Sequence, residues 1–298
     1  MSLNEWILLI ILSILWGGSF FFVKLALKEI PPLTIVLCRV FIAAIILNII
    51  SVFSGFKFSD LIKHWKSFLI MGLLNNVIPF SFITLGQTEI AAGLASILIS
   101  TTPLFAFIFA HSLTKDEKLT TKKSIGVILG ILGVSLMIGI DSIKGLSNGV
   151  IGESLCLIAS FSYAMAGIFG KRLKGIPTLL TATGQVTMST ILLIPIALFI
   201  DHPLALKMPN LTSLLSVLSL GVFSTTLAYL IYFKLLQKSG ATNTLLVTYL
   251  IPISALLLGI EVLHEVIETQ HYLGMFLIIL GLISIDGRIF NLIRPNKN

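Results

Sequence analysis

The sequence predicts an all-α integral membrane protein with ten transmembrane helices, arranged as two inverted five-helix repeats. Of the 298 residues, 56% are hydrophobic and only 11% are charged, whereas soluble proteins carry about 25% charged residues. Ten apolar windows are long enough to cross a bilayer core, which is about 30 Å thick and needs about 20 helical residues. The spacing of several residues in the first half of the chain recurs in the second half. These three observations fix the predicted fold class.

The ten windows follow one another with short connections. Unbroken apolar runs such as FIAAIILNII in the second window favour helices over the alternating pattern of a transmembrane barrel. The first window has neither a basic start nor a small-residue cleavage site before Lys24, so we expect a retained helix and not a signal peptide. The predicted spans are 5–25, 32–53, 66–86, 91–111, 122–140, 149–169, 178–200, 211–236, 241–263 and 270–290.

Basic residues predict the orientation of these spans. Most of the 20 lysines and arginines lie in alternate connections on one side, whereas the other side has only Lys24, Lys28, Lys144 and Lys207. Cytoplasmic connections carry the excess of Lys and Arg, so both termini are predicted to be cytoplasmic. The net charge of +7 is then explained by topology and by the anionic lipid of the cytoplasmic leaflet, and it does not indicate a nucleic acid partner.

An internal repeat is the third observation. The segment from Glu117 to Met137 is similar to the segment from Glu265 to Ile285 at a spacing of 148. Further pairs at spacings from 146 to 149 are Lys24 with Lys171, Pro31 with Pro177, Gly72 with Gly221 and Pro103 with Pro252. Five spans per repeat is an odd number, so the second copy must cross the membrane in the opposite sense. The sequence therefore predicts one repeat at 1–140 and an inverted repeat at 141–298, an architecture that suits alternating access.

These features resemble the EamA-type branch of the drug/metabolite transporter superfamily over nearly the whole chain. The resemblance is carried by WGGSFFFVK in the first span, LCRVF in the second, the prolines of STTPLF and YLIPIS, and a glutamate before each glycine-spaced helix. It implies a ten-helix inner-membrane carrier with both termini inside, which exports small metabolites, amino acids or drugs through a central cavity. The second repeat departs from the first, because Tyr163 replaces Trp16 and Gln185 stands where Arg39 stands.

Arg39 and Glu153 are predicted to lie inside the membrane, where a charge costs about 2.5 to 3.5 kcal/mol at a helix centre. Both are expected near the outer side and within reach of each other. Arg39 is a candidate for binding a substrate carboxylate, with Glu153 as a competing partner or proton acceptor. The alternatives are a structural pair between the two residues, or an arginine that extends to the interface.

The other candidate residues are polar, aromatic, small or helix-bending. Lys24 and Lys171 end matching spans and are candidates for binding an anionic substrate at each mouth, or for interfacial anchoring. Trp16, Tyr163, Gln185 and Tyr229 are candidates for lining the cavity. Gly17 and Gly18 predict close helix packing or a bend, and the matched Pro103 and Pro252 predict a gate or a static bend.

The predicted function is a secondary transporter that exports small metabolites such as amino acids or their derivatives. Export of organic cations or drugs is the alternative, and a channel or a membrane enzyme is weaker. No nucleotide-binding loop occurs and the connections are too short for an ATPase domain. HEVIE at His264 lacks the second histidine of a zinc helix, so no catalytic residue, metal or cofactor is predicted. The expected partners are a small-molecule substrate, the lipid bilayer, and a proton or counter-substrate.

Overall fold

The computed structural model describes residues 1–113, 121–138, 148–244 and 246–286, and within these ranges it is helical with no strand. The elements in chain order are α1 (Leu3–Ala26), α2 (Pro32–Phe53), α3 (Phe58–Lys63), α4 (Trp65–Gly72), η1 (Leu73–Val77), α5 (Ile78–Glu89), α6 (Ala92–Ile99), α7 (Thr102–Leu113), α8 (Thr121–Ile138), α9 (Asn148–Gly170), η3 (Lys171–Leu173), α10 (Thr178–Ile200), η4 (Pro203–Ala205), α11 (Leu211–Gly221), η5 (Val222–Leu227), α12 (Ala228–Thr244), α13 (Val247–Glu261) and α14 (Thr269–Asp286). The prediction of an all-α chain is confirmed for the described residues.

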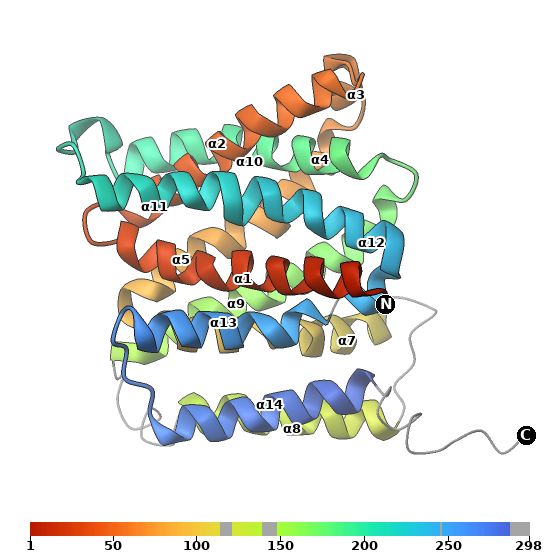
Figure 1. Cartoon of the computed structure of the whole chain (residues 1–298), viewed down its shortest axis with the longest axis vertical. Coiled ribbons are helices and arrows are strands. Elements are labelled where there is room, and N and C mark those ends of the chain that lie inside the picture. Colours follow the sequence, from red (N-terminus) through yellow and green to blue (C-terminus); the bar gives the residue numbers. More distant parts are fainter. Residues whose placement is uncertain (114–120, 139–147, 245, 287–298) are drawn as a thin grey trace, which may run out of the picture.

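In the described ranges, seven helices are long and apolar enough to cross a membrane by length and composition, and three shorter apolar helices cover Ser124–Leu136, Val247–Glu261 and Thr269–Ser284. The long helices run side by side across Figure 1. Their outer faces expose large apolar side chains, such as Ile10 at 49%, Ile45 at 46% and Leu257 at 58%. Apolar surface of this extent is stable in lipid and not in water. The chain is a multi-pass integral membrane protein.

Helix ends mostly agree with the predicted spans. Two predicted spans, 32–53 and 178–200, coincide with α2 and α10. The fourth predicted span, 91–111, is divided between α6 and α7 by a turn at Ser100 and Thr101. The predicted break between the eighth and ninth spans is confirmed, because the helical segment that starts at Leu211 is kinked at Gly240 before a short stretch that reaches Thr244. Gly240 is non-helical (φ 77°), and Thr244 Oγ1 donates back to the Gly240 carbonyl (2.9 Å).

The third and the eighth predicted spans each contain one π-helical segment. In such a segment the backbone hydrogen bonds reach one residue further than in an α-helix. These segments are η1, between α4 and α5, and η5, between α11 and α12. Their first residues, Leu73 and Val222, are 149 positions apart, which is the spacing of Gly72 and Gly221.

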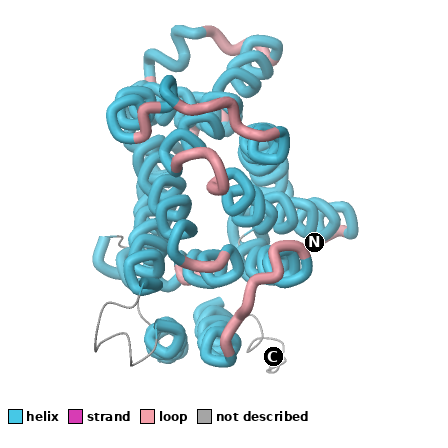
Figure 2. The backbone as a smooth tube through the Cα atoms, turned by 90° about the vertical axis from the view of Figure 1, so that its left-hand side faces the viewer, coloured by secondary structure: helices cyan, strands magenta, loops and turns pink. Residues whose placement is uncertain are grey.

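Helices α8 and α14 form a closely packed pair at one end of the molecule (bottom of Figure 1; the same pair is seen end-on at the bottom of Figure 2). A Cβ atom added at Gly133 would lie 2.7 Å from the carbonyl oxygen of Gly274, and one added at Gly281 would lie 2.5 Å from that of Gly126. Both glycines therefore let the two backbones touch, as small residues do between membrane helices.

The largest buried cluster joins both halves of the chain, since it includes Phe20 and Ile97 from the first half and Cys156, Leu256 and Ile278 from the second. Neither Cys38 nor Cys156 is in a disulfide. The predicted boundary between the repeats 1–140 and 141–298 lies outside the described ranges. The same is true of the basic residues at 114–120 and 287–298, and of Glu117, which is the repeat partner of Glu265.

Candidate functional site

The two π-helices bring polar groups to the centre of the bundle. A π-helical turn leaves carbonyl groups without their usual α-helical partners, and hydroxyl groups take up this role here. In η5, Thr225 Oγ1 donates to the carbonyl of Leu220 (2.8 Å) and Thr226 Oγ1 to that of Gly221 (2.9 Å). In η1, the carbonyl of Leu74 accepts from Ser162 of α9 (2.7 Å). Hydroxyl groups thus hydrogen-bond to the backbone of both π-helices.

Arg39 of α2 lies against η5. Its Nε donates to Thr225 Oγ1 (2.8 Å) and its Nη2 to the carbonyl of Ser224 (3.4 Å). The guanidinium carbon is 3.8 Å from the centroid of the Phe80 ring, a cation–π contact. Arg39 is only 7% exposed, and these two hydrogen bonds use two of its five N–H groups. Among the described residues, this buried cation is therefore held by neutral groups only, with donor capacity left over.

Side-chain amides and hydroxyls form a second group beside η1. Asn75 Nδ2 donates to Gln185 Oε1 (3.1 Å), and the hydroxyl of Tyr229 donates to Asn76 Oδ1 (2.6 Å). Asn76 Nδ2 donates to Ser189 Oγ (3.0 Å). These residues come from η1, α10 and α12, so the group joins helices of both halves of the chain.

Two glycines place Arg39 and Gln185 next to the π-helices. A Cβ atom at Gly72 would lie 2.7 Å from the carbonyl oxygen of Gln185, and one at Gly221 would lie 3.2 Å from that of Arg39 and 2.6 Å from Ile42 Cβ. Gly72 of the first half thus packs on α10 of the second, and Gly221 of the second half packs on α2 of the first. Because of these reciprocal contacts, Arg39 and Gln185, which match in the internal repeat, each pack beside the glycine that precedes a π-helix.

Aromatic rings border the polar groups. Trp16 packs beside Tyr229, and its ring centroid is 5.5 Å from that of Tyr232. Tyr163 packs in the same cluster as Phe80, the ring under Arg39. The structure therefore brings five of the predicted candidates into one neighbourhood: Trp16, Arg39, Tyr163, Gln185 and Tyr229.

Lys24 lies away from this centre, at the end of α1. Its Nζ donates to the carbonyl of Gln87 (2.7 Å), and Gln87 Nε2 donates back to the carbonyl of Phe20 (2.9 Å). Gln87 is fully buried, and its Oε1 has no hydrogen-bond partner in the part of the chain that the structure describes. Lys24 thus ties α1 to the end of α5, a contact that any movement between these helices would break.

Glu265 closes the same end of the molecule. Its carboxylate accepts from the backbone N–H groups of Ala92 (2.7 Å) and Gly93 (3.2 Å), the first two residues of α6. The glutamate that precedes the glycine-spaced helix therefore caps another helix, from the other half of the chain. A carboxylate at a helix N-terminus is favoured by the free N–H groups and the helix dipole.

Replacing Glu265 with alanine is expected to lower the free energy of unfolding by about 1 kcal/mol, because it removes this cap. The exposed Glu268 is the matched control, since it lies three residues later and its carboxylate accepts from the side chain of Gln270 (2.7 Å). Thermal unfolding of the purified protein in detergent would measure the difference. Equal melting temperatures for Glu265→Ala and Glu268→Ala would contradict the capping role.

Glu153 and Lys171 are not brought to the centre. The predicted proximity of Arg39 and Glu153 was wrong, because Arg39 faces η5 and Phe80, whereas Glu153 lies beside Gly152, which packs on Gly86 of α5. Glu153 is 6% exposed, and no described residue forms a hydrogen bond with its Oε2. Lys171 follows the opposite end of α9 and is exposed.

Gly17 and Gly18 lie in a continuous helix without a break. A Cβ atom at Gly17 would collide with Ser254 Oγ and lie 2.9 Å from the carbonyl oxygen of Ile251, whereas one at Gly18 would have its nearest neighbour at 3.8 Å. Close packing on α13 is therefore the observed role of Gly17.

Pro103 is the second residue of α7, directly after the turn that separates it from α6, whereas Pro252 lies inside the unbroken α13.

Gly17→Val is expected to lower the free energy of unfolding by about 1 to 3 kcal/mol, the usual cost of overpacking. Gly18→Val is the matched control, because position 18 has room for a small side chain. The melting temperatures of both variants in detergent measure this. If the Gly18 variant is as unstable as the Gly17 variant, the loss of stability comes from the helix propensity of valine and not from contact with α13.

The sequence-based reasoning missed Ser189, Ser224, Thr225 and the cation–π contact with Phe80. One signal was available: Gly72 and Gly221 are matched, and each is followed directly by a segment with adjacent polar residues, LLNNV and VFSTT. Among the described residues, no group of three or more His, Cys, Asp or Glu side chains is placed to hold a metal ion.

Comparison with known proteins also divides the chain into two similar halves. The EamA-like transporter family matches the chain twice, over residues 4–139 and 150–285. The chain belongs to the EamA-like transporter family. Its function is therefore transport in general terms, and the two matches leave little of the chain outside a family domain.

Relatives of this EamA-like chain are similar over nearly their full length. The uncharacterized transporter YoaV of Bacillus subtilis is 27% identical over 92% of this chain and 94% of its own. The uncharacterized inner membrane transporter YedA of Escherichia coli K12 is 25% identical over 92% of this chain and 88% of its own. A solved crystal structure that is 16% identical shares the fold, with a TM-score of 0.66 over 95% of this chain and 97% of that chain.

Proposed function

We propose that this protein is a secondary carrier of the inner membrane that moves small metabolites bearing a carboxylate, such as amino acids or their derivatives, out of the cell. The observation that carries the proposal is the state of Arg39. Its guanidinium is buried, and its contacts among the described residues are a hydroxyl, a carbonyl and a ring.

A buried charge is costly when no opposite charge accompanies it. A substrate carboxylate would supply that charge, and the planar guanidinium can donate two parallel hydrogen bonds to it. The neighbouring amides of Asn75, Asn76 and Gln185 and the hydroxyl of Tyr229 offer donors and acceptors for the remaining polar groups of the substrate. Trp16 and Tyr163 border the site and would contact its apolar part.

Alternating access by two inverted five-helix repeats is the proposed mechanism. It is supported by the double family match, by the π-helices at a spacing of 149, and by the exchange of contacts at Gly72 and Gly221. The contacts of Lys24 with Gln87 and of Glu265 with α6 lie at one end of the bundle, so their release would open that end. Pro103 lies at the break between α6 and α7, a position suited to a hinge, and Pro252 is its repeat partner.

The predicted excess of basic residues on one side supports termini in the cytoplasm. The carrier needs no cofactor in this proposal, and neither an ATPase subunit nor a nucleic acid takes part. A gradient of the substrate itself, a counter-substrate or a proton drives it. The protein performs no chemical conversion, so it is not proposed as an enzyme.

Counterflow in proteoliposomes tests the proposal. Vesicles are preloaded with an unlabelled amino-acid mixture, and a trace of labelled amino acids is added outside. Transient accumulation above equilibrium marks a carrier, whereas flux that scales linearly with the gradient marks a channel. Protein-free vesicles serve as the control.

Export of organic cations is the second candidate. The clustered rings of Trp16, Tyr232 and Phe233 favour it, because a ligand cation binds over aromatic faces. Accumulation of a labelled organic cation, with none for amino acids, would select this candidate and reject the first.

A further inference from the structure

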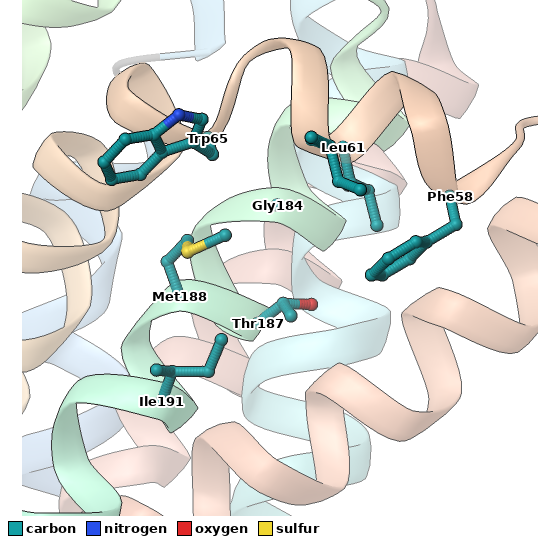
Figure 3. A pocket seen from close by; sticks show the side chains of 8 residues that line it. Phe58, Leu61, Trp65, Gly184, Thr187, Met188 and Ile191 are labelled. Carbon is teal, nitrogen blue, oxygen red and sulfur yellow. The ribbon is translucent and has the colours of Figure 1, made fainter.

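An apolar groove runs along the outside of the bundle, away from the polar centre. It has a volume of about 390 Å³ and lies between the segment around α3 and the middle of α10. In Figure 3, Phe58, Leu61 and Trp65 lie on one side of it, and Gly184, Met188 and Ile191 on the other. Ile62 and Thr187 complete the lining.

The groove offers no free polar group to an occupant. Thr187 carries the single side-chain oxygen of the lining, and that hydroxyl accepts from Asn48 Nδ2 (2.9 Å) and donates to the carbonyl of Thr183 (2.7 Å). The edges are open, since Phe58 is 71% exposed and Ile191 is 55% exposed. In a membrane protein, an open apolar groove is accessible to lipid chains moving within the bilayer.

The surroundings of the groove are basic. Lys57, Lys63 and Lys66 are exposed beside it, and Lys66 Nζ lies 5.7 Å from the centroid of the Trp65 ring that lines it. The acidic residue in this stretch, Asp60, accepts from the backbone N–H of Lys57 (2.9 Å). The groove thus joins a hydrocarbon surface to a cluster of cations.

We propose that this groove binds an anionic phospholipid, with an acyl chain against α10 and the phosphate at Lys63 and Lys66. The apolar lining selects the chain, and the two lysines select the headgroup. Basic residues at a membrane surface favour anionic lipid by about fivefold each. This site is separate from the proposed transport site, and it does not depend on the nature of the substrate.

The chain provides its own probe, because it has only three tryptophans: Trp6, Trp16 and Trp65. In a Trp6→Phe/Trp16→Phe background, Trp65 is the sole tryptophan and reports on the groove. Vesicles are prepared with brominated phosphatidylglycerol or brominated phosphatidylcholine in an otherwise zwitterionic bilayer, since bromine atoms on the acyl chains quench nearby indole fluorescence.

Quenching by the anionic lipid is expected to exceed that by the zwitterionic lipid, with a relative binding constant of about 5 to 25. Lys63→Gln/Lys66→Gln should bring the ratio close to one, whereas Lys207→Gln, at the opposite end of α10, should leave it unchanged. Ile191→Phe should reduce quenching by both lipids, and Ile253→Phe should not, since Ile253 is similarly exposed (51%) on α13.

The zwitterionic lipid also controls for folding, because its quenching should be equal in the background and in the double lysine variant. Equal quenching by both lipids in the background would overturn the proposal. An anionic preference that survives the loss of both lysines would overturn it as well, because the headgroup would then be bound elsewhere.

Discussion

Arg39→Gln is expected to lower the initial rate of counterflow by about 10-fold to 100-fold. Glutamine cannot pair with a carboxylate charge, and a hydrogen bond to a charged group contributes about 1.5 to 3 kcal/mol. Thr225 and the carbonyl of Ser224 would keep a neutral amide as partner, so the variant should still fold. The measurement is counterflow with the labelled substrate found for the unaltered protein.

Lys28→Gln is the matched control, since Lys28 is an exposed cation that follows α1. Arg39→Lys separates charge from geometry, because lysine keeps the charge and loses the planar pair of donors. Counterflow at the normal rate in Arg39→Gln, with folded protein shown by an unchanged melting temperature, would contradict a role for Arg39 in substrate binding.

Gly133→Leu and Gly281→Leu are each expected to lower the melting temperature in detergent by about 5 to 10 °C. Each added side chain would enter the space of a backbone carbonyl on the facing helix, at Gly274 or Gly126. Backbone cannot move aside as a flexible side chain can, so the cost should reach the upper end of the 1 to 3 kcal/mol of overpacking. Gly167→Leu is the control, because no atom of the described residues lies within 4 Å of a Cβ at Gly167.

The two destabilising variants should lower the free energy of unfolding equally, within about 1 kcal/mol. Gly133 contacts the carbonyl of Gly274 and Gly281 contacts that of Gly126, and these two contacts are equivalent under the internal repeat. Gly126 and Gly274, like Gly133 and Gly281, are 148 positions apart. A large effect at one position and none at the other would show that α8 and α14 are not packed as equivalent helices.

Much of the helical framework was predictable from the sequence, because prolines and polar connections mark where helices begin. Pro32 starts α2, and Pro177 directly precedes α10, so both helices matched the predicted ranges. The kink within α12 was predictable as well. Gly240 has a positive φ (77°), which glycine adopts readily, and the long helix that starts at Leu211 ends there. In the short stretch that follows, Asn243 and Thr244 donate back to the carbonyls of Ser239 and Gly240.

The candidate site was predictable only in part. A charge within an apolar span drew attention to Arg39, but its contacts depend on η5, which helical periodicity does not reveal. The residue that a π-helix adds shifts every later side chain by about 100° around the helix axis, so a regular pattern misplaces Thr225. The pairing of Arg39 with Glu153 failed for a related reason: similar depth in the membrane does not place two side chains on facing surfaces.

The matched π-helices also bear on the history of the chain. A π-helical segment arises most simply when one residue is inserted into an α-helix. Here η1 and η5 begin one residue after Gly72 and Gly221, respectively. Since the family domain occurs twice in the chain, one insertion that preceded gene duplication accounts for both segments, whereas a later origin requires two independent events at the same place. The ancestral half-length protein, on this account, already carried the irregular helix that now positions the polar centre.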